Sequence, residues 1–217
     1  MRDTCEFAAE TTFRYRVLKR AVDLLMAAAA LVLVAPAMLL IAALTWLRSG
    51  RPLWLAQERV GRGGGRFVLY KFRTLPLCSL KDKDHCWVAA PTDGWGRFLR
   101  NTGLDELPQL WNVLRGDMSL VGPRPERPYF VERFEREFPL YASRHRLRPG
   151  ITGWAQVNGW RGNTSIPRRV AHDLSYLRHW SLAFDLRILG ITLLNFVRQL
   201  WEPAAALASG APDARSV

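Results

Sequence analysis

The longest feature in the hydrophobic pattern is a run without charge from Leu24 to Leu47. At about 1.5 Å of rise per residue, an α-helix of this length can cross the roughly 30 Å hydrocarbon core of a bilayer. The run is too long for the apolar part of a secretory signal peptide, and no small-residue cleavage site with a polar flank follows it. The pattern therefore predicts a membrane helix. Asp23, directly before the run, is expected to pair with Lys19 or Arg20, because an unpaired carboxylate at a membrane boundary is costly.

The flanks of this run and its central proline leave two arrangements open. The flanking basic residues are Arg14, Arg16, Lys19 and Arg20 on one side and Arg48 and Arg51 on the other. Positive charge at both ends gives no orientation under the positive-inside rule. Pro36 lies near the middle, where it removes a backbone hydrogen bond and bends the helix. A helix that crosses the membrane and a re-entrant hairpin with both ends in the cytoplasm both fit this pattern.

Beyond Pro52 the pattern changes to two short strand-like runs, residues 53–60 (LWLAQERV) and 66–73 (RFVLYKFR). A glycine-rich segment from Gly61 to Gly65 (GRGGG) separates them. Such a segment can cradle phosphate or resemble an RNA-binding repeat, but strand-like runs on both sides favour a β-hairpin connection. Residues 76–96 are polar and predict an irregular surface loop.

The stretch from Asn101 to Pro125 (NTGLDELPQLWNVLRGDMSLVGPRP) carries the pattern of an amphipathic helix. Its apolar positions follow the spacing i, i+3, i+4 and i+7, at Leu107, Leu110, Trp111 and Leu114. Proline is tolerated only in a first turn, so Pro108 predicts a helix that begins close to Asp105, and Gly116 is a natural end. Asp105 and Glu106 would then lie at the helix N-terminus, where the dipole favours negative charge and keeps Asp105 ionised.

Two further apolar helices are expected. Within residues 129–141, phenylalanines recur every four residues with charges between them, which indicates a helix that either faces the core or lies in the membrane interface. Residues 186–201 are too few to span a bilayer and are expected to form an interfacial or packed helix. Residues 202–217 are rich in Ala, Pro, Ser and Gly and predict a disordered tail. The expected fold is an α/β, mostly helical, membrane-associated domain.

Composition adds a constraint on the partners. The 31 Lys and Arg residues against 19 Asp and Glu give a net charge of +12, which implies nucleic acid, anionic lipid headgroups or phosphorylated substrates. The nine tryptophans suit a protein at a membrane interface. Cys5, Cys78 and Cys86 form no CxxC spacing and argue against a disulfide scaffold. Cys78, His85 and Cys86 lack a fourth zinc ligand at finger-like spacing.

The adjacent carboxylates Asp105 and Glu106 are the best catalytic candidates. One can attack phosphorus while the other holds a divalent cation, and hard oxygen ligands of this kind suit magnesium. The alternative is structural, since acidic residues are common in first helical turns. The cations that could bind a diphosphate are Lys71, Arg73, Arg97, Arg100 and Arg124. Pro123 and Pro125 would hold Arg124 in a rigid turn.

The motifs KRAVD, ERVG, KFRT, LDELPQLWNVLRGDMSLVGPRP and RPGITGWAQVNG occur in this order, with the proline-containing apolar helix after the first. Together they resemble the monotopic polyprenyl-phosphate phosphoglycosyltransferases, the bacterial sugar transferases that start glycan assembly. The resemblance covers about Lys19 to Phe196, and the long LDELPQ…GPRP motif is its most specific part. This chain has Ala35 where the family often has Ser before the breaking proline, and Leu75 in place of the usual Met.

This resemblance implies a role for each candidate residue. Asp105 resembles the nucleophile that takes the phosphosugar covalently and releases UMP, and Glu106 resembles the magnesium (Mg2+) ligand. Pro36 matches the proline that breaks a re-entrant membrane helix, with both helix ends in the cytoplasm. The family positions around the active site, which would bind substrate phosphate, are matched by Lys71, Arg73, Arg100 and Arg124.

The resemblance implies a minimal catalytic unit at the bacterial inner membrane. Its parts are an N-terminal arm and re-entrant helix (1–48), a cytoplasmic catalytic domain with interfacial helices (49–201) and the tail (202–217). The implied partners are a UDP-sugar, undecaprenyl phosphate and membrane lipids, without nucleic acid. The segment after Asn158 favours a hexose-1-phosphate, from UDP-glucose or UDP-galactose. The alternative is a non-enzymatic basic protein that binds nucleic acid or anionic lipid at the membrane, as the charge and the GRGGGR segment suggest.

Overall fold

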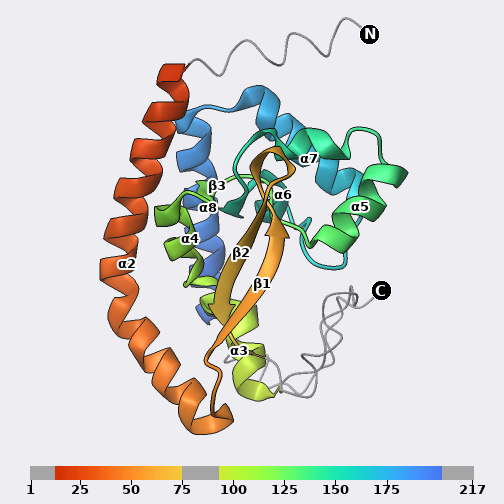
Figure 1. The fold of residues 1–217 in the computed structure, drawn as a ribbon. Helices are drawn as coiled ribbons and strands as arrows, with labels where there is room; N and C mark the ends of the chain where they lie inside the picture. The colour runs from red at the N-terminus through yellow and green to blue at the C-terminus, as the bar shows by residue number, and fades with distance from the viewer. Residues whose placement is uncertain (1–12, 75–92, 202–217) are drawn as a thin grey trace, which may run out of the picture.

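The computed structural model describes residues 13–74 and 93–201. The helices make up most of the domain (Figure 1) and are α2 (Phe13–Ser49), α3 (Gly94–Thr102), α4 (Gln109–Arg115), α5 (Pro128–Glu137), α6 (Trp154–Val157), α7 (Ile166–His179) and α8 (Leu182–Trp201). The strands are β1 (Trp54–Val60), β2 (Arg66–Phe72), β3 (Ser119–Val121) and β4 (Gly150–Thr152), and the 3-10 turns are η1 (Arg62–Gly64), η3 (Leu104–Glu106) and η4 (Tyr141–Arg146). The cysteines, most of the expected loop and the expected tail lie outside these ranges, and α3 begins inside the expected loop.

Helix α2 is continuous from Phe13 to Ser49 and curves along one side of the domain (Figure 1). Among the described residues, only its segment Val17–Ser49 is long and apolar enough to cross a membrane. Pro36 lies inside the helix and does not end it. The predicted break at Pro36 is therefore not confirmed: the helix continues through this residue and curves, because proline removes only one backbone hydrogen bond of a helix that has 37 residues.

A narrow stripe of α2 packs on the domain, while the opposite face is exposed. Ala27 is fully buried in the main hydrophobic core, and Ile41 packs with Phe72 and Leu99 in a second cluster. The exposed face carries large apolar side chains, namely Leu25, Val32, Leu33, Leu39, Leu40 and Leu47. The domain therefore contacts α2 on both sides of Pro36, and the helix leaves an apolar surface along its length.

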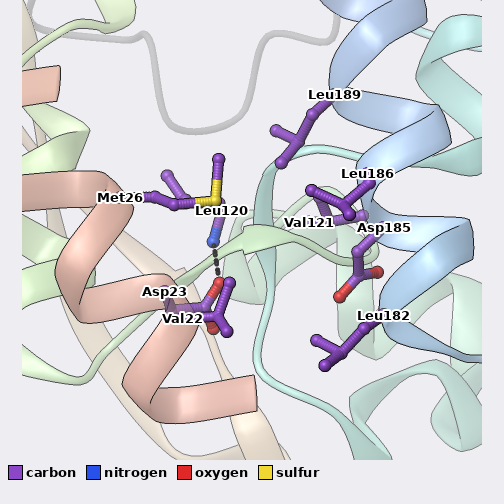
Figure 2. A pocket seen from close by; sticks show the side chains of 9 residues that line it. All are labelled: Val22, Asp23, Met26, Leu120, Val121, Leu182, Asp185, Leu186 and Leu189. Carbon is purple, nitrogen blue, oxygen red and sulfur yellow. Dashed lines mark hydrogen bonds between the residues drawn. The ribbon is translucent and has the colours of Figure 1, made fainter. Parts of the chain in front are cut away.

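Buried charges anchor the first half of α2. Asp23 accepts hydrogen bonds from the Ser119 hydroxyl at 2.7 Å and from the Leu120 N–H at 3.1 Å. Lys19 lies 3.9 Å from Asp23 and pairs more closely with Asp185 of α8, at 2.7 Å. Figure 2 shows the two aspartates on either side of a small, mainly apolar crevice between α2 and α8. The predicted local salt bridge of Asp23 is thus a minor contact, because β3 offers it shorter hydrogen bonds.

The predicted β-hairpin is confirmed. Strands β1 and β2 pair antiparallel over all seven residues of each strand. The segment Gly61–Gly65 forms their connection. Within it, Gly63 and Gly64 have φ angles of 67° and 80°, a left-handed region that glycine adopts without strain.

Helix α4 begins at Gln109, later than the predicted start near Asp105. Asp105 lies in the preceding 3-10 turn, η3, because Pro108 has no N–H and regular α-helical bonding starts only after it. The predicted end is confirmed, since Gly116 closes the helix with a φ of 100°. The predicted apolar face is only partly buried, because Trp111 is 55% exposed.

The two C-terminal predictions are resolved differently. Helix α5 faces the core, because Phe130 and Phe134 are buried in a cluster with Tyr141 and Val170. Helix α8 packs through the buried Ile188 and exposes apolar side chains on another side, at Leu186, Leu193, Leu194 and Val197. The core-facing alternative is therefore supported for α5, whereas α8 has both a packed and an exposed apolar face.

Asn112 joins α4 to the hairpin, and its replacement should destabilise the fold. Its buried side chain accepts a hydrogen bond from the Tyr70 N–H at 3.1 Å and donates one to the Val68 carbonyl at 2.7 Å. We expect Asn112→Ala to lower the free energy of unfolding by about 1 to 3 kcal/mol, because two partly buried backbone groups of β2 lose their partners. Thermal melting measures the change, with the exposed Asn158→Ala as the control. Equal melting temperatures for the two variants would contradict this role of Asn112.

Candidate active site

Asp105 and Glu106 lie in the 3-10 turn η3, between α3 and α4. The turn follows Gly103, which ends α3 with a φ of 75°, and the Glu106 N–H bonds to the Gly103 carbonyl at 3.0 Å. Asp105 is 4% exposed, and the Glu106 side chain is partly buried. A tight turn therefore holds the two carboxylates, in place of the predicted first turn of an α-helix.

The Arg124 guanidinium contacts both carboxylate oxygens of Glu106. Its Nη1 donates to Oε2 at 3.0 Å, and its Nη2 donates to Oε1. Two parallel contacts of this kind fix the geometry of an arginine–carboxylate pair as well as its energy. The structure thus brings together two residues that the sequence singled out separately.

The turn that carries Arg124 follows β3, which pairs in parallel with β4. The Gly122 N–H donates to the Thr152 carbonyl at 2.9 Å, and the Gly150 N–H donates to the Pro123 carbonyl at 3.0 Å. A Cβ atom at Gly150 would lie 2.1 Å from the Gly122 nitrogen, so the two backbones approach too closely for any other residue. The sequence pattern does not predict this pairing, because strands of three residues are too short to show alternation.

Two predicted cations lie close to the carboxylate pair. Lys71 is near the end of β2 and Arg100 in the last turn of α3, and both lower the pKa of Asp105 by their positive charge. The Arg100 Nε also donates to the Thr74 hydroxyl at 2.8 Å. Burial lowers the pKa of Lys71, as expected for an ammonium group removed from water. The predicted residues Lys71, Arg100, Asp105, Glu106 and Arg124 therefore form one cluster.

The structure adds two cations that sequence reasoning missed. Arg59 of β1 lies near Arg124 and Glu106, and burial lowers its pKa to about 10. Arg161, in the segment before α7, helps to lower the pKa of Glu106. The ERVG motif, to which Arg59 belongs, could have pointed to this residue as a site cation. Arg161 has no such motif, and only its charge could have suggested it.

Arg73 lies outside the cluster of phosphate-directed cations. Its buried guanidinium donates to the carbonyls of Ser49 and Gly50, at 2.5 Å and 3.0 Å. These contacts stabilise the C-terminal end of α2, where orphan carbonyl groups need donors. Arg97 is exposed on α3. The structure therefore gives Arg73 a structural contact and does not support its predicted role as a phosphate ligand.

The two carboxylates titrate very differently. Burial raises the pKa of Asp105 to about 6, and the charge of Glu106 adds to this shift. Burial also acts to raise the pKa of Glu106, but the charge and hydrogen bonds of Arg124 more than offset it and lower the pKa to about 2. Asp105 is therefore still mainly ionised at neutral pH, as expected, but the expected helix N-terminus is not the cause, because Asp105 lies in a 3-10 turn and burial raises its pKa.

The donor set fits a magnesium ion only in company with a substrate. Among the residues that the structure describes, no group of three or more His, Cys, Asp or Glu side chains could hold a metal ion. Asp105 and Glu106 do supply the hard oxygen atoms that magnesium prefers, and this ion commonly takes one or two carboxylates together with phosphate oxygens. Because Arg124 contacts both oxygens of Glu106, a bound ion would share that carboxylate with the guanidinium.

The structure combines a long apolar helix packed along a small domain with a buried Asp105 and a partly buried Glu106 among cations, which is typical of the class of domains that bind anionic groups near an apolar surface. Comparison with known families agrees with this class. The family described as bacterial sugar transferase matches residues 14–199, and the chain belongs to this family.

Several relatives carry names that state a reaction. One is the UDP-N-acetylgalactosamine-undecaprenyl-phosphate N-acetylgalactosaminephosphotransferase of Aeromonas hydrophila, with 42% identity over 82% of this chain and 43% of the relative. Another is the UDP-glucose:undecaprenyl-phosphate glucose-1-phosphate transferase of Escherichia coli, with 41% identity over 83% of this chain and 40% of the relative. The chain thus spans about two fifths of the length of these relatives. It spans 86% of a sugar transferase of Bacillus subtilis, at 40% identity.

Asp105→Asn tests the burial of this carboxylate by stability alone. The pKa of Asp105 in the folded protein is about 6, against an ordinary value of 3.8, so its ionised form destabilises the fold. We expect the variant to gain roughly 3 kcal/mol of unfolding free energy above about pH 7. The gain should shrink as the pH falls from about 6 towards 4, because the wild-type carboxylate then takes up its proton. Melting temperatures of both proteins across this range measure it, and a difference independent of pH would contradict the raised pKa.

Proposed function

We propose that this protein transfers a sugar-1-phosphate, a hexose-1-phosphate, from a UDP-sugar to undecaprenyl phosphate and releases UMP. The family and the names of the relatives support the general reaction. The observation that carries the proposal is the environment of Asp105, whose buried carboxylate has a pKa of about 6. It lies beside Glu106, which Arg124 holds, and within the electrostatic reach of Lys71 and Arg100. Such a site attracts phosphate groups around a nucleophilic oxygen.

The proposed reaction has two displacements at one phosphorus atom. In the first, a carboxylate oxygen of Asp105 attacks the phosphorus that bears the sugar. The bond from this phosphorus to the bridging oxygen breaks, UMP leaves with the electron pair, and an aspartyl-phosphosugar remains. In the second, a phosphate oxygen of undecaprenyl phosphate attacks the same phosphorus, and Asp105 leaves as a free carboxylate. Two anionic substrates can thereby use one site in turn.

Charge repulsion opposes attack by a carboxylate on a diphosphate, and the cluster around Asp105 reduces this repulsion. Lys71, Arg100 and Arg124 place positive charge where charge develops in the transition state. Magnesium, held by Glu106 and by substrate phosphates, would neutralise further oxygen charge. The raised pKa also makes the Asp105 carboxylate more basic, and hence more nucleophilic, than an exposed aspartate.

The choice of a hexose follows from the C-terminal segment after Asn158 and from relatives named as glucose-1-phosphate transferases. One of these, from Caulobacter vibrioides, is 43% identical over 78% of this chain and 66% of its own length. The Aeromonas relative, named for N-acetylgalactosamine, marks the main competing donor. A panel of UDP-sugars that includes both classes separates them.

We further propose that α2 is a re-entrant helix in the inner membrane, with both ends and the domain on the cytoplasmic side. The packing of α2 supports this, because Ala27 in the first half and Ile41 in the second half contact the same domain. A helix that crossed the bilayer would carry its second half away from a domain on the cytoplasmic side. Basic residues at both ends, Lys19 and Arg48 among them, favour the same side for each end.

Release of UMP by the wild type and its loss in Asp105→Asn test the reaction. With undecaprenyl phosphate, magnesium and a panel of UDP-sugars, the detergent-solubilised wild type should release UMP over many turnovers. We expect Asp105→Asn to lower the rate by at least about 1000-fold, because the nucleophile is gone while the fold is retained. The exposed Glu132→Gln is the matched control and should keep the wild-type rate. A wild-type rate of UMP release by Asp105→Asn would contradict the covalent mechanism.

Cysteine-accessibility labelling tests the topology of α2. Single cysteines placed at Arg16 and at Arg51, in a protein whose native cysteines are replaced by serine, report the two ends of the helix. For a re-entrant helix, a membrane-impermeant reagent should label neither site in intact spheroplasts and both sites after lysis. Labelling of one site alone before lysis would show that the helix crosses the membrane.

A further inference from the structure

Residues 124–126 belong to no helix or strand, but each of their three carbonyl groups accepts a hydrogen bond from another part of the domain. The Arg124 carbonyl accepts from Arg144 Nη2 at 2.9 Å, and the Pro125 carbonyl accepts from Arg59 Nη1 at 3.1 Å. The Glu126 carbonyl accepts from a backbone N–H of β1 at 2.9 Å. Each contact comes from a side chain or strand distant in sequence, so the position of this segment depends on the assembled fold.

Arg144, in η4, is bound on three sides. It is 1% exposed, and its Nε and Nη2 contact Asp173 Oδ2 of α7 at 3.0 Å and 2.7 Å. Its Nη1 donates to the Tyr141 hydroxyl at 2.8 Å. Because Asp173 and Tyr141 fix the plane of the guanidinium, the Nη2 group is directed at the Arg124 carbonyl as well.

Helix α7 also contacts residues 124–126 through a second arginine. Arg169 lies one turn before Asp173 on the buried face of α7, and its Nη1 donates to Glu126 Oε1 at 2.7 Å. The Glu126 carboxylate also lies 3.7 Å from Arg59 Nη1. Helix α7 therefore contacts the Glu126 end of this segment directly through Arg169, and it acts on the Arg124 end through the contact of Asp173 with Arg144.

We propose that Arg144, oriented by Asp173, is a positioning residue for the active site. It holds the Arg124 backbone where the Arg124 guanidinium meets both oxygens of Glu106, and it acts only through Arg124. This inference rests on the proposed phosphosugar transfer, in which Arg124 and Glu106 surround the reacting phosphate. A misplacement of about 1 Å in such a site can lower a rate on the order of 100-fold.

The double variant Arg144→Met with Asp173→Leu separates positioning from folding. Apolar side chains of similar volume often replace a buried ion pair without loss of stability. We expect a melting temperature near that of the wild type, a kcat for UMP release lower by about 100-fold, and a smaller change in KM for the UDP-sugar. A wild-type kcat in the folded variant would overturn the proposal, because the pair would then serve the fold alone.

A milder variant and a matched control complete the test. If the double variant does not fold, Arg144→Lys keeps a cation beside Asp173 but cannot supply the directed donors of a guanidinium, and kcat should fall roughly 10-fold. A wild-type kcat there would overturn the proposal. The control, Arg133→Met with Glu137→Leu, removes an exposed 2.7 Å ion pair on α5 and should keep the wild-type kcat. An equal fall in the control would also overturn it.

Hydrogen exchange distinguishes a failure of this inference from a failure of the proposed function. If the wild type releases no UMP from any UDP-sugar, the proposed function fails, and the contact between Arg144 and the Arg124 segment is then tested by exchange alone. Peptides that contain Val60 or Gly122, whose N–H groups bond to the Glu126 and Thr152 carbonyls, should exchange faster in the Arg144→Met, Asp173→Leu variant than in the wild type and in the α5 control. Equal exchange in all three proteins would overturn the proposal.

Discussion

Two neighbouring carboxylates in one turn, the buried Asp105 and the partly buried Glu106, repel each other, and the site of this domain depends on how that repulsion is offset. Arg124 compensates Glu106 almost completely, so that its pKa falls to about 2. Asp105 receives only the weaker fields of Lys71, Arg124 and Arg100, and burial leaves its pKa at about 6. Because nearby cations stabilise the negative charge of Glu106 more than that of Asp105, Glu106 stays ionised easily, whereas the ionised form of Asp105 destabilises the fold. This difference is the physical basis on which Asp105 is proposed as the nucleophile.

The contact between Arg124 and Glu106 depends in turn on elements far from both residues. Close backbone contact between Gly122 and Gly150 joins β3 to β4 and sets the start of the turn. The ion pair of Arg144 with Asp173 secures its end. The position of the charged side chains in the site thus depends on short backbone contacts and on a buried, hydrogen-bonded ion pair, which makes the surrounding structure rigid.

Helix α2 serves the fold and the proposed membrane contact at once. Small and medium side chains such as Ala27 and Ile41 pack into the domain, whereas Leu25 and Leu33 remain exposed. These four residues are all apolar, so their polarity does not distinguish the two sides, and only polar residues such as the buried Asp23 and Thr45 mark the side that faces protein. Burial of one stripe ties both halves of the helix to the same domain and leaves the other face exposed, which suits the proposed contact with lipid.

The sequence by itself determined the features that depend on neighbours along the chain. Strand-like runs on both sides of Gly61–Gly65 predicted the hairpin, Gly116 predicted the end of α4, and the motif around Asp105 and Glu106 marked these two residues as catalytic candidates. Tertiary structure decided which charged and polar groups meet. Asp23 accepts a hydrogen bond from Ser119, and Arg73 binds the carbonyls at the end of α2 and lies outside the site. Local signals survive in a linear pattern because a turn or a helix end is made within a few residues. The partner and the pKa of a charged group depend on which distant elements pack around it and exclude water. The spacing of residues along the chain does not contain this information.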